Sequence, residues 1–216
     1  MRRPHLRRYG PAARWYDLLS GEWPVYRLGR VVGIGQLGLR EGDRVLDIGC
    51  GTGLNFPLVR ALVGASGAVI GVDASAAMLE GARSRIADHG WSNVEIHRGD
   101  AADLSTILGD VESFDAVLFT YSLSIIGAWR SVFSQAGALI RPGGRMVVVD
   151  LALPIGRWRL LSPLARLACF TGGVDVRRAP WALILDGLGA TSHRVLRGGH
   201  IHVVVGTVDR AQQSTR

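Results

Sequence analysis

Short apolar runs alternate with longer segments of helical spacing between residues 41 and 151. Compact apolar runs bounded by glycine, proline or charged residues are typical of buried strands, whereas apolar positions three and four apart indicate helices. Strands are predicted at 45–48, 68–73, 94–97, 114–119 and 145–151, and helices near 54–63, 75–88 and 128–140. This alternation predicts an α/β fold with a parallel sheet, in which 141–144 (Arg-Pro-Gly-Gly) forms a turn.

The regions outside this unit have patterns of their own. Apolar runs at 193–196 and 201–208, separated by four residues that include Gly198 and Gly199, predict a final hairpin. Residues 25–37 have helical spacing ahead of the first strand. Residues 152–179 are the least regular part, where arginines 157, 159 and 166 recur among apolar positions and predict a basic amphipathic helix. We expect that helix to pack on the core, with contact to a membrane as the alternative.

The segment 45–53 (VLDIGCGTG) is the most informative part of the chain. It predicts a buried strand that ends in Asp47 and a turn with glycines at 49, 51 and 53. Because alternate glycines remove each Cβ from one side of the turn, a ligand can lie against bare backbone there. The helix that follows directs its N-terminal N–H groups and positive dipole end into the same crevice.

Polar residues also follow the next three predicted strands. Asp73 ends the second strand, and its spacing from Gly53 is about that which places a carboxylate on ribose hydroxyls. Asp100 follows the third strand, where it would face the base of a nucleoside. The fourth strand ends at 120–122 (Thr-Tyr-Ser). In open α/β sheets ligands bind at these carboxyl ends, so the pattern predicts a nucleoside site.

This ordered set resembles the class I S-adenosylmethionine-dependent methyltransferases, closely over residues 40 to 151. The resemblance rests on the loop at 47–53, on Asp73, on 99–101 (Gly-Asp-Ala) and on 139–144. Within this class, the sequence most resembles the small ubiquinone/menaquinone-type and phospholipid-type methyltransferases. It implies a Rossmann-like, doubly wound, seven-stranded and mostly parallel sheet with an antiparallel last strand and an N-terminal helical lid.

The same resemblance implies a domain division and a cofactor. Residues 1–40 would form an arm and lid helices, 41–208 the methyltransferase domain with a substrate-side insertion at 152–179, and 209–216 a tail. S-adenosylmethionine would be held by residues that match the family motifs, with its ammonium on Asp47, its ribose on Asp73 and its adenine amino group on Asp100. Met78 could pack on the adenine, although a Met at helical spacing is more often a core residue, and Asn55 is equally a helix cap. The implied cofactor site comprises Asp47, Gly49, Cys50, Gly51, Gly53, Asn55, Asp73, Ala74, Met78, Asp100, Ala101 and Thr120.

A dinucleotide-binding dehydrogenase is the main alternative for the glycine loop. Its fingerprint G-x-G-x-x-G requires glycine three residues after Gly51, and Leu54 stands there. The acid two residues before Gly49 and the final hairpin also favour a methyltransferase.

The catalytic residue is left open by the sequence. Methyl transfer needs the acceptor held in line, and an oxygen or carbon acceptor also needs a base. Tyr121 and Ser122 follow the fourth strand, Tyr16 belongs to the expected lid, and His200 lies in the hairpin loop. We expect a histidine in such a loop to be solvated.

Composition limits the remaining classes. The 216 residues suit one domain, and no apolar run reaches the ~18 residues that a spanning helix needs; a cytoplasmic location, with peripheral membrane contact as a variant, is expected. The net charge of +7 comes from 25 basic residues that are all arginine. Neither Asn-Pro-Pro-Tyr nor Pro-Cys follows the fourth strand, which makes nucleic acid an unfavoured partner. Two cysteines, 50 and 169, form neither a disulfide framework nor a metal-binding pattern.

We therefore expect an S-adenosylmethionine-dependent methyltransferase that acts on a small hydrophobic or lipid-like acceptor. An RNA or protein methyltransferase and a non-catalytic S-adenosylmethionine-binding protein are the alternatives. The oligomeric state stays open.

Overall fold

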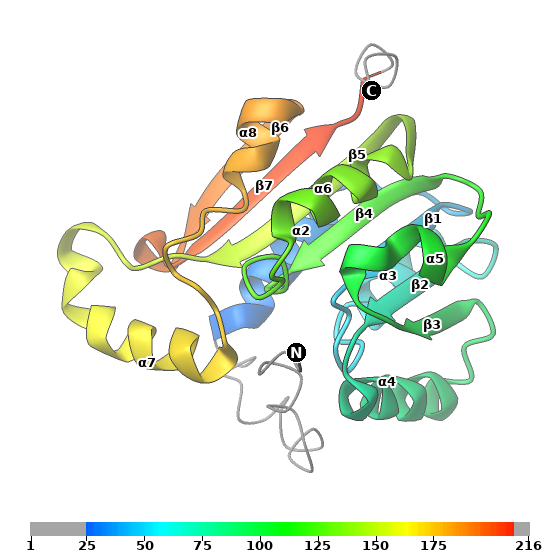
Figure 1. The fold of residues 1–216 in the computed structure, drawn as a ribbon, viewed down its shortest axis with the longest axis horizontal. Coiled ribbons are helices and arrows are strands. Elements are labelled where there is room, and N and C mark those ends of the chain that lie inside the picture. Colours follow the sequence, from blue (N-terminus) through cyan, green and yellow to red (C-terminus); the bar gives the residue numbers. More distant parts are fainter. Residues whose placement is uncertain (1–24, 210–216) are drawn as a thin grey trace.

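The computed structural model describes residues 25–209, which form one seven-stranded sheet covered by helices (Figure 1). The strand order is β3-β2-β1-β4-β5-β7-β6. β7 lies antiparallel between β5 and β6, and the other neighbours are parallel. The predicted doubly wound sheet and its final hairpin are therefore confirmed. The strands are β1 (Arg44–Ile48), β2 (Ala68–Asp73), β3 (Val94–Arg98), β4 (Phe114–Thr120), β5 (Ile140–Leu151), β6 (Gly189–Leu196) and β7 (Ile201–Thr207).

Two layers of helices cover the two faces of the sheet. One hydrophobic cluster joins the sheet to α2, α3 and α4, and the other joins it to α5, α6 and α8. The central strands are apolar on both sides: in β5, Met146 and Val148 belong to one cluster and Val147 and Val149 to the other. The helices are α2 (Arg27–Gln36), α3 (Phe56–Val63), α4 (Ala76–His89), η3 (Ala101–Asp103), α5 (Leu104–Leu108), α6 (Trp129–Ala138), η4 (Gly156–Leu161), α7 (Ser162–Gly172), α8 (Ala182–Gly187) and η5 (Arg197–Gly199).

The helix expected at 25–37 is α2, and it packs on the sheet against β5 and β7. Two glycines allow the close approach. A Cβ at Gly29 would lie 2.2 Å from the hydroxyl of Tyr121, and one at Gly33 would lie 2.6 Å from a methyl group of Val149. The remainder of the expected lid, including Tyr16, lies outside the described residues.

Two local predictions differ from the structure. The expected turn at 141–144 lies inside β5, where the pairing with β4 jumps from Phe114–Ile140 to Ala116–Arg145. The turn is thus a bulge in a longer strand, and the N–H of Gly143 donates to the carbonyl of Val208 at 2.8 Å. In addition, the helix after the glycine loop begins at Phe56 instead of residue 54, because the loop continues through Asn55.

Candidate functional site: polar residues at the strand tips

The parallel pairing of β1 with β2 and β4, and of β2 with β3, brings the predicted polar residues to one edge of the sheet. Asp47 lies near the end of β1, Asp73 ends β2 and Thr120 ends β4. Asp100 follows β3, and its carboxylate accepts from the N–H of Ala102 at 3.0 Å. Ligands of open α/β sheets bind at this edge.

The glycine loop between β1 and α3 is held by backbone hydrogen bonds and by packing. The N–H groups of Gly49 and Cys50 donate to the carbonyl of Val72 at 2.8 and 3.1 Å. A Cβ at Gly49 would lie 2.4 Å from the Cβ of Ser122, and one at Gly53 would lie 2.5 Å from the ring of Phe56. These two glycines are therefore required by the fold.

Gly51 differs from its neighbours in the loop. Its φ is +57°, yet a Cβ there would meet nothing within 4 Å. The positive φ by itself favours glycine at this position. The open surroundings also leave room for a ligand to lie against this backbone.

Asp73 connects the second strand to the glycine loop. Its Oδ2 accepts from the N–H of Gly51 at 2.9 Å, and its Oδ1 accepts from the N–H of Ser75 at 2.8 Å. Burial raises the pKa of this carboxyl, and the two N–H donors act against that rise. Since each carboxylate oxygen has two lone pairs, Asp73 can accept further hydrogen bonds from ribose hydroxyls.

A buried polar cluster lies on the other side of the loop. The Nδ2 of Asn55 donates to Oδ1 and Oδ2 of Asp47, both at 2.9 Å, and lies 2.7 Å from the hydroxyl of Thr120. Asp47 is fully buried, and burial raises its pKa to about 6, while Asn55 and the charge of Arg30 lower it and the charge of Asp73 raises it. A buried acid with so few donors suits a cationic ligand group.

Arg30 on α2 completes this cluster, although it was not among the predicted site residues. Its Nη1 donates to Oδ1 of Asn55 at 2.7 Å and to the hydroxyl of Thr120 at 3.1 Å. The residue is only 8% exposed. The signal for it in the sequence is an arginine within an apolar helical pattern, next to Gly29.

Asn55 does not cap α3, contrary to one of the two expectations for it. It occupies the N-cap position but makes no capping hydrogen bond, because its side chain is turned inward to Asp47 and Thr120. Three other residues of the implied cofactor site are buried. Cys50 is buried, and burial keeps the pKa of its thiol far above the usual value. Met78 and Ala101 are also buried.

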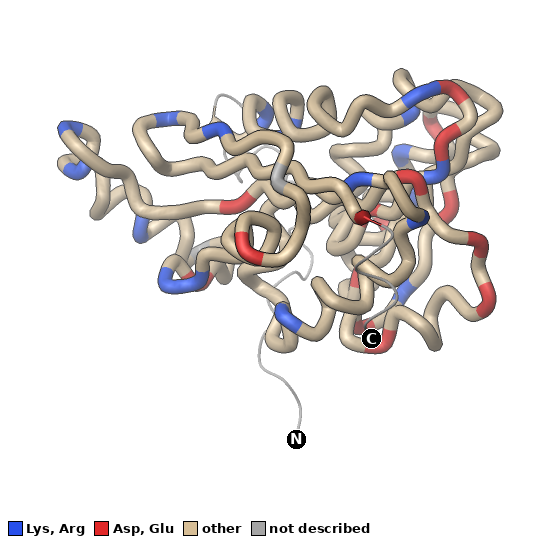
Figure 2. The backbone as a smooth tube through the Cα atoms, turned by 90° about the horizontal axis from the view of Figure 1, so that it is seen from above, with Lys and Arg blue, Asp and Glu red and all other residues tan. Residues whose placement is uncertain are grey.

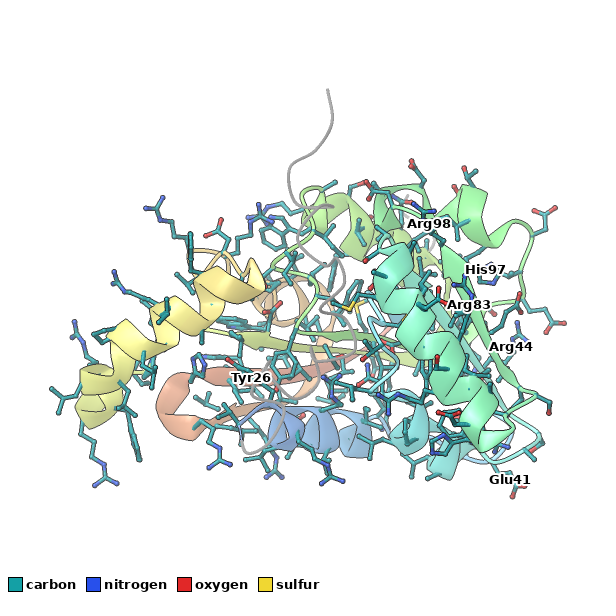
Figure 3. The ribbon with its side chains drawn as sticks, turned by 90° about the horizontal axis from the view of Figure 1, so that it is seen from below. Tyr26, Glu41, Arg44, Arg83, His97 and Arg98 are labelled. Carbon is teal, nitrogen blue, oxygen red and sulfur yellow. The ribbon has the colours of Figure 1, made fainter. Side chains whose placement is uncertain are left out.

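Three aromatic side chains lie beyond the cluster, at the ends of β4, α2 and β7. Tyr121 has φ of +58°, and such a backbone conformation in a non-glycine residue is a frequent mark of functional sites. Its hydroxyl donates to the carbonyl of Tyr26 at 2.7 Å, and the two rings lie 5.2 Å apart. The ring of His200 lies 6.2 Å from that of Tyr26. Figure 3 labels Tyr26, which lies next to the start of α2.

His200 is 7% exposed, so the expectation that it is solvated is wrong. Its Nδ1 lies 2.6 Å from the carbonyl of Ala152, and because a carbonyl only accepts, Nδ1 carries the proton. Nε2 is then the ring nitrogen that is left to accept a proton. Ser122 is a poorer candidate, since its hydroxyl donates to the carbonyl of Ile48 at 2.7 Å and its Cβ packs on Gly49.

Known proteins of similar sequence and fold are methyltransferases. The family described as "Methyltransferase domain" matches residues 39–172. The ubiquinone/menaquinone biosynthesis C-methyltransferase UbiE of Hahella chejuensis is 32% identical over 149 residues, which are 68% of this chain and 59% of that protein. The demethylmenaquinone methyltransferase of Symbiobacterium thermophilum is 27% identical over 179 residues, 78% of this chain and 69% of that protein. A SAM-dependent methyltransferase structure from Aquifex aeolicus has a TM-score of 0.62 at 17% identity and covers 91% of this chain and 98% of its own.

The chain therefore belongs to the methyltransferase domain family, within the class I S-adenosylmethionine-dependent methyltransferases. Its relatives by sequence include quinone methyltransferases, and it spans 59% of the length of the Hahella protein. The residues present fit the cofactor of this class. Open backbone at Gly51, a buried acid at Asp47 and a strand-tip acid at Asp73 match a nucleoside with a charged amino-acid group.

Proposed function

We propose that this protein transfers a methyl group from S-adenosylmethionine to a small, lipid-like acceptor of the quinone type. The observation that carries the cofactor half is the glycine loop: Gly51 has open surroundings and donates its N–H to Asp73, and the buried Asp47 lies near the end of the preceding strand β1. The acceptor half is supported by two relatives, a ubiquinone/menaquinone biosynthesis C-methyltransferase and a demethylmenaquinone methyltransferase. It is also supported by the aromatic residues at the end of β4.

The amino-acid end of the cofactor would lie in the cluster of Asp47, Asn55, Thr120 and Arg30. Asp47 would accept from the ammonium group, and Arg30 supplies a positive charge close to where the carboxylate must lie. Asp73 would hold the ribose hydroxyls. Asp100 and the N–H of Ala101 would hold the adenine, with Ala74 and Met78 beside the ring and Gly49, Cys50 and Gly53 shaping the loop.

The bound sulfonium supplies an already activated methyl group, so the protein has to position the acceptor and accept a proton. Tyr26 and Tyr121 offer flat apolar surfaces for an aromatic acceptor. His200, whose Nδ1 is engaged by the carbonyl of Ala152, would take a proton from an acceptor hydroxyl through Nε2. Asp47, Asn55 and Thr120 are buried, and the exclusion of water from these groups strengthens their polar contacts.

A lipid-like acceptor would be met at a membrane, so the proposal includes peripheral membrane contact. Among residues 25–209, no helix has both the length and the apolar character needed to cross a bilayer. Any such contact by the described chain is therefore made at the membrane surface.

The proposal is tested with Asp73→Ala and His200→Gln. Calorimetric titration with S-adenosylmethionine should give weaker binding to Asp73→Ala, by roughly 1.5–3 kcal/mol for each charge-assisted hydrogen bond lost. His200→Gln should bind the cofactor normally but turn over a short-chain demethylated quinol more slowly. Unchanged affinity in Asp73→Ala contradicts the ribose assignment. Cofactor binding without methylation of any quinol, or salt-sensitive methylation of RNA instead, contradicts the acceptor class.

A further inference from the structure

The η4–α7 segment exposes an unusual amount of apolar surface. Seven of the twelve exposed large hydrophobic side chains in the described part of the chain lie between residues 155 and 170. Leu160 is 88% exposed, Phe170 68% and Leu164 66%. The whole set, called the η4–α7 face below, is Ile155, Trp158, Leu160, Leu161, Leu164, Leu167 and Phe170.

The helix α7 has one buried side and one exposed apolar side. Ala165 and Cys169, one helical turn apart, are buried against the domain. Leu164, Leu167 and Phe170 follow one another at intervals of three residues and point away from the core, where a helix in water normally carries polar groups. The expected packing on the core therefore holds for a narrow stripe only, and the side chains of Leu164 and Leu167 remain largely exposed.

The inner side of α7 lies next to the acceptor end of the site. The charge of Asp150 acts on Cys169 and, after burial, contributes to raising the pKa of its thiol to about 11. Cys169 belongs to the hydrophobic cluster against which Tyr26 and Tyr121 pack, and the Tyr26 ring is 5.2 Å from that of Tyr121. The exposed face and the aromatic residues of the candidate acceptor site are thus on opposite sides of one helix.

The face is supported by the final hairpin. The N–H of Ile155 donates to the carbonyl of Gly198 at 2.9 Å. A Cβ at Gly198 would lie 2.3 Å from the ring of Trp158, and one at Gly199 would lie 2.6 Å from the side chain of Ile155. η4 therefore packs directly on η5, and this packing holds Ile155 and Trp158 in place.

Positive charge surrounds this apolar surface. Arginines 157, 159 and 166 lie within it, and residues 151–174 contain no Asp or Glu. Arg159 and Arg166 also line a pocket of about 780 Å³, together with Leu153, Pro154 and Ile155. Figure 2 shows that the end of the molecule formed by η4 and α7 carries mainly basic residues, whereas acidic and basic residues are mixed at the opposite end.

The charge indicates what covers the face. A second copy of the same face would place arginine against arginine, and the N-terminal segment, with arginines 2, 3, 7 and 8, is also basic. An anionic bilayer complements both properties at once, since its headgroups attract arginine and its acyl region accepts leucine and phenylalanine. We propose that the η4–α7 face docks on the surface of an anionic lipid bilayer. This inference rests on the proposed function only in that it places the acceptor site next to the membrane that would hold a lipid-like acceptor.

The test is co-sedimentation of the full chain with vesicles, in the absence of cofactor and acceptor. Vesicles of phosphatidylcholine alone are compared with vesicles that contain phosphatidylglycerol, at low and high salt. We expect binding to the anionic vesicles that weakens with salt. The triple variant Leu164→Ser, Leu167→Ser, Phe170→Ser should bind at least about tenfold more weakly, equivalent to ~1.4 kcal/mol. The matched control Leu62→Ser, Leu185→Ser, which changes exposed leucines elsewhere, should bind as the unchanged protein does.

Three results overturn the proposal: no binding to anionic vesicles at low salt, equal binding by the triple variant, or a self-association in solution that the triple variant abolishes. The last would identify a second copy as the occupant. Cofactor affinity and the melting temperature of each variant establish that the fold is intact. Methylation of a soluble quinol without vesicle binding would overturn the docking alone, whereas vesicle binding without methylation would overturn only the proposed function.

Discussion

Arg30 and Asn55 are joined by a hydrogen bond of 2.7 Å between the guanidinium Nη1 and the amide Oδ1. The bond connects α2, which precedes the sheet, to the start of α3, which follows the glycine loop. Asn55 also contacts both carboxylate oxygens of Asp47. Arg30 is therefore close enough for its charge to lower the pKa of Asp47, the acid expected to hold the cofactor. The N-terminal helix is therefore part of the site as well as part of the helical layer.

Replacement of Arg30 by methionine should weaken cofactor binding and raise the pKa of Asp47 further. Arg30 lowers that pKa through its charge, and the variant removes the charge while keeping an apolar stem of similar length. Calorimetric titration with S-adenosylhomocysteine between pH 5.5 and about 8 measures both effects. Arg30→Lys should retain part of the charge effect. An identical affinity and pH profile in Arg30→Met would exclude Arg30 from the site.

Cofactor affinity should also depend on pH through Asp47. Its pKa is raised to about 6 by burial, and only the ionised carboxylate attracts an ammonium group. Affinity should therefore be constant well above pH 6 and fall about tenfold per unit below it. Asp47→Asn should bind more weakly at neutral pH and lack this acidic limb. The stability of the fold should change with pH in the opposite direction. The raised pKa of Asp47 favours the folded state at low pH, and that contribution is lost as the pH rises through about 6.

The sequence was sufficient for the sheet because its signals are local. Each strand-end acid follows an apolar run, so Asp47, Asp73 and Asp100 could be assigned to one edge without coordinates. Arg30 could not be assigned, since its contacts with Asn55 and Thr120 span 25 and 90 residues. The burial of His200 was missed for the same reason: it follows from the packing of the hairpin loop against Tyr26 and Ala152.

The outer face of α7 shows another limit of sequence patterns. Spacing of apolar residues identified an amphipathic helix but not which of its sides meets the core. The core accepts the small residues Ala165 and Cys169, and the larger side chains of Leu164 and Phe170 remain outside. Periodicity alone assigns large apolar residues to the inside, and here tertiary packing reverses that order.

Gly51→Ala should separate the needs of the ligand from those of the fold. With φ at +57° and no atom within 4 Å of the new Cβ, the substitution should cost folding only the ~1–2 kcal/mol of a left-handed residue. It should reduce cofactor affinity about tenfold or more, because the methyl group would occupy ligand space. Gly90→Ala is the matched control, since Gly90 also has positive φ (+62°) and open surroundings but caps α4. Equal affinity in the two variants would mean that the cofactor does not lie on Gly51.

The close approach of α2 to the sheet predicts opposite effects for two alanine substitutions in one helix. At Gly29 the new Cβ would lie 2.2 Å from the Tyr121 hydroxyl and 2.8 Å from Ile201, so overpacking should lower the free energy of unfolding by about 1–3 kcal/mol. At Gly35, which is exposed with nothing within 4 Å, alanine should instead raise it by up to about 1 kcal/mol through helix propensity. Urea denaturation of both variants measures the difference. Gly29→Ala should also weaken cofactor binding, because a displaced α2 moves Arg30 away from Asn55. Stabilisation by both substitutions would show that α2 does not pack on β5 and β7 at the distance described.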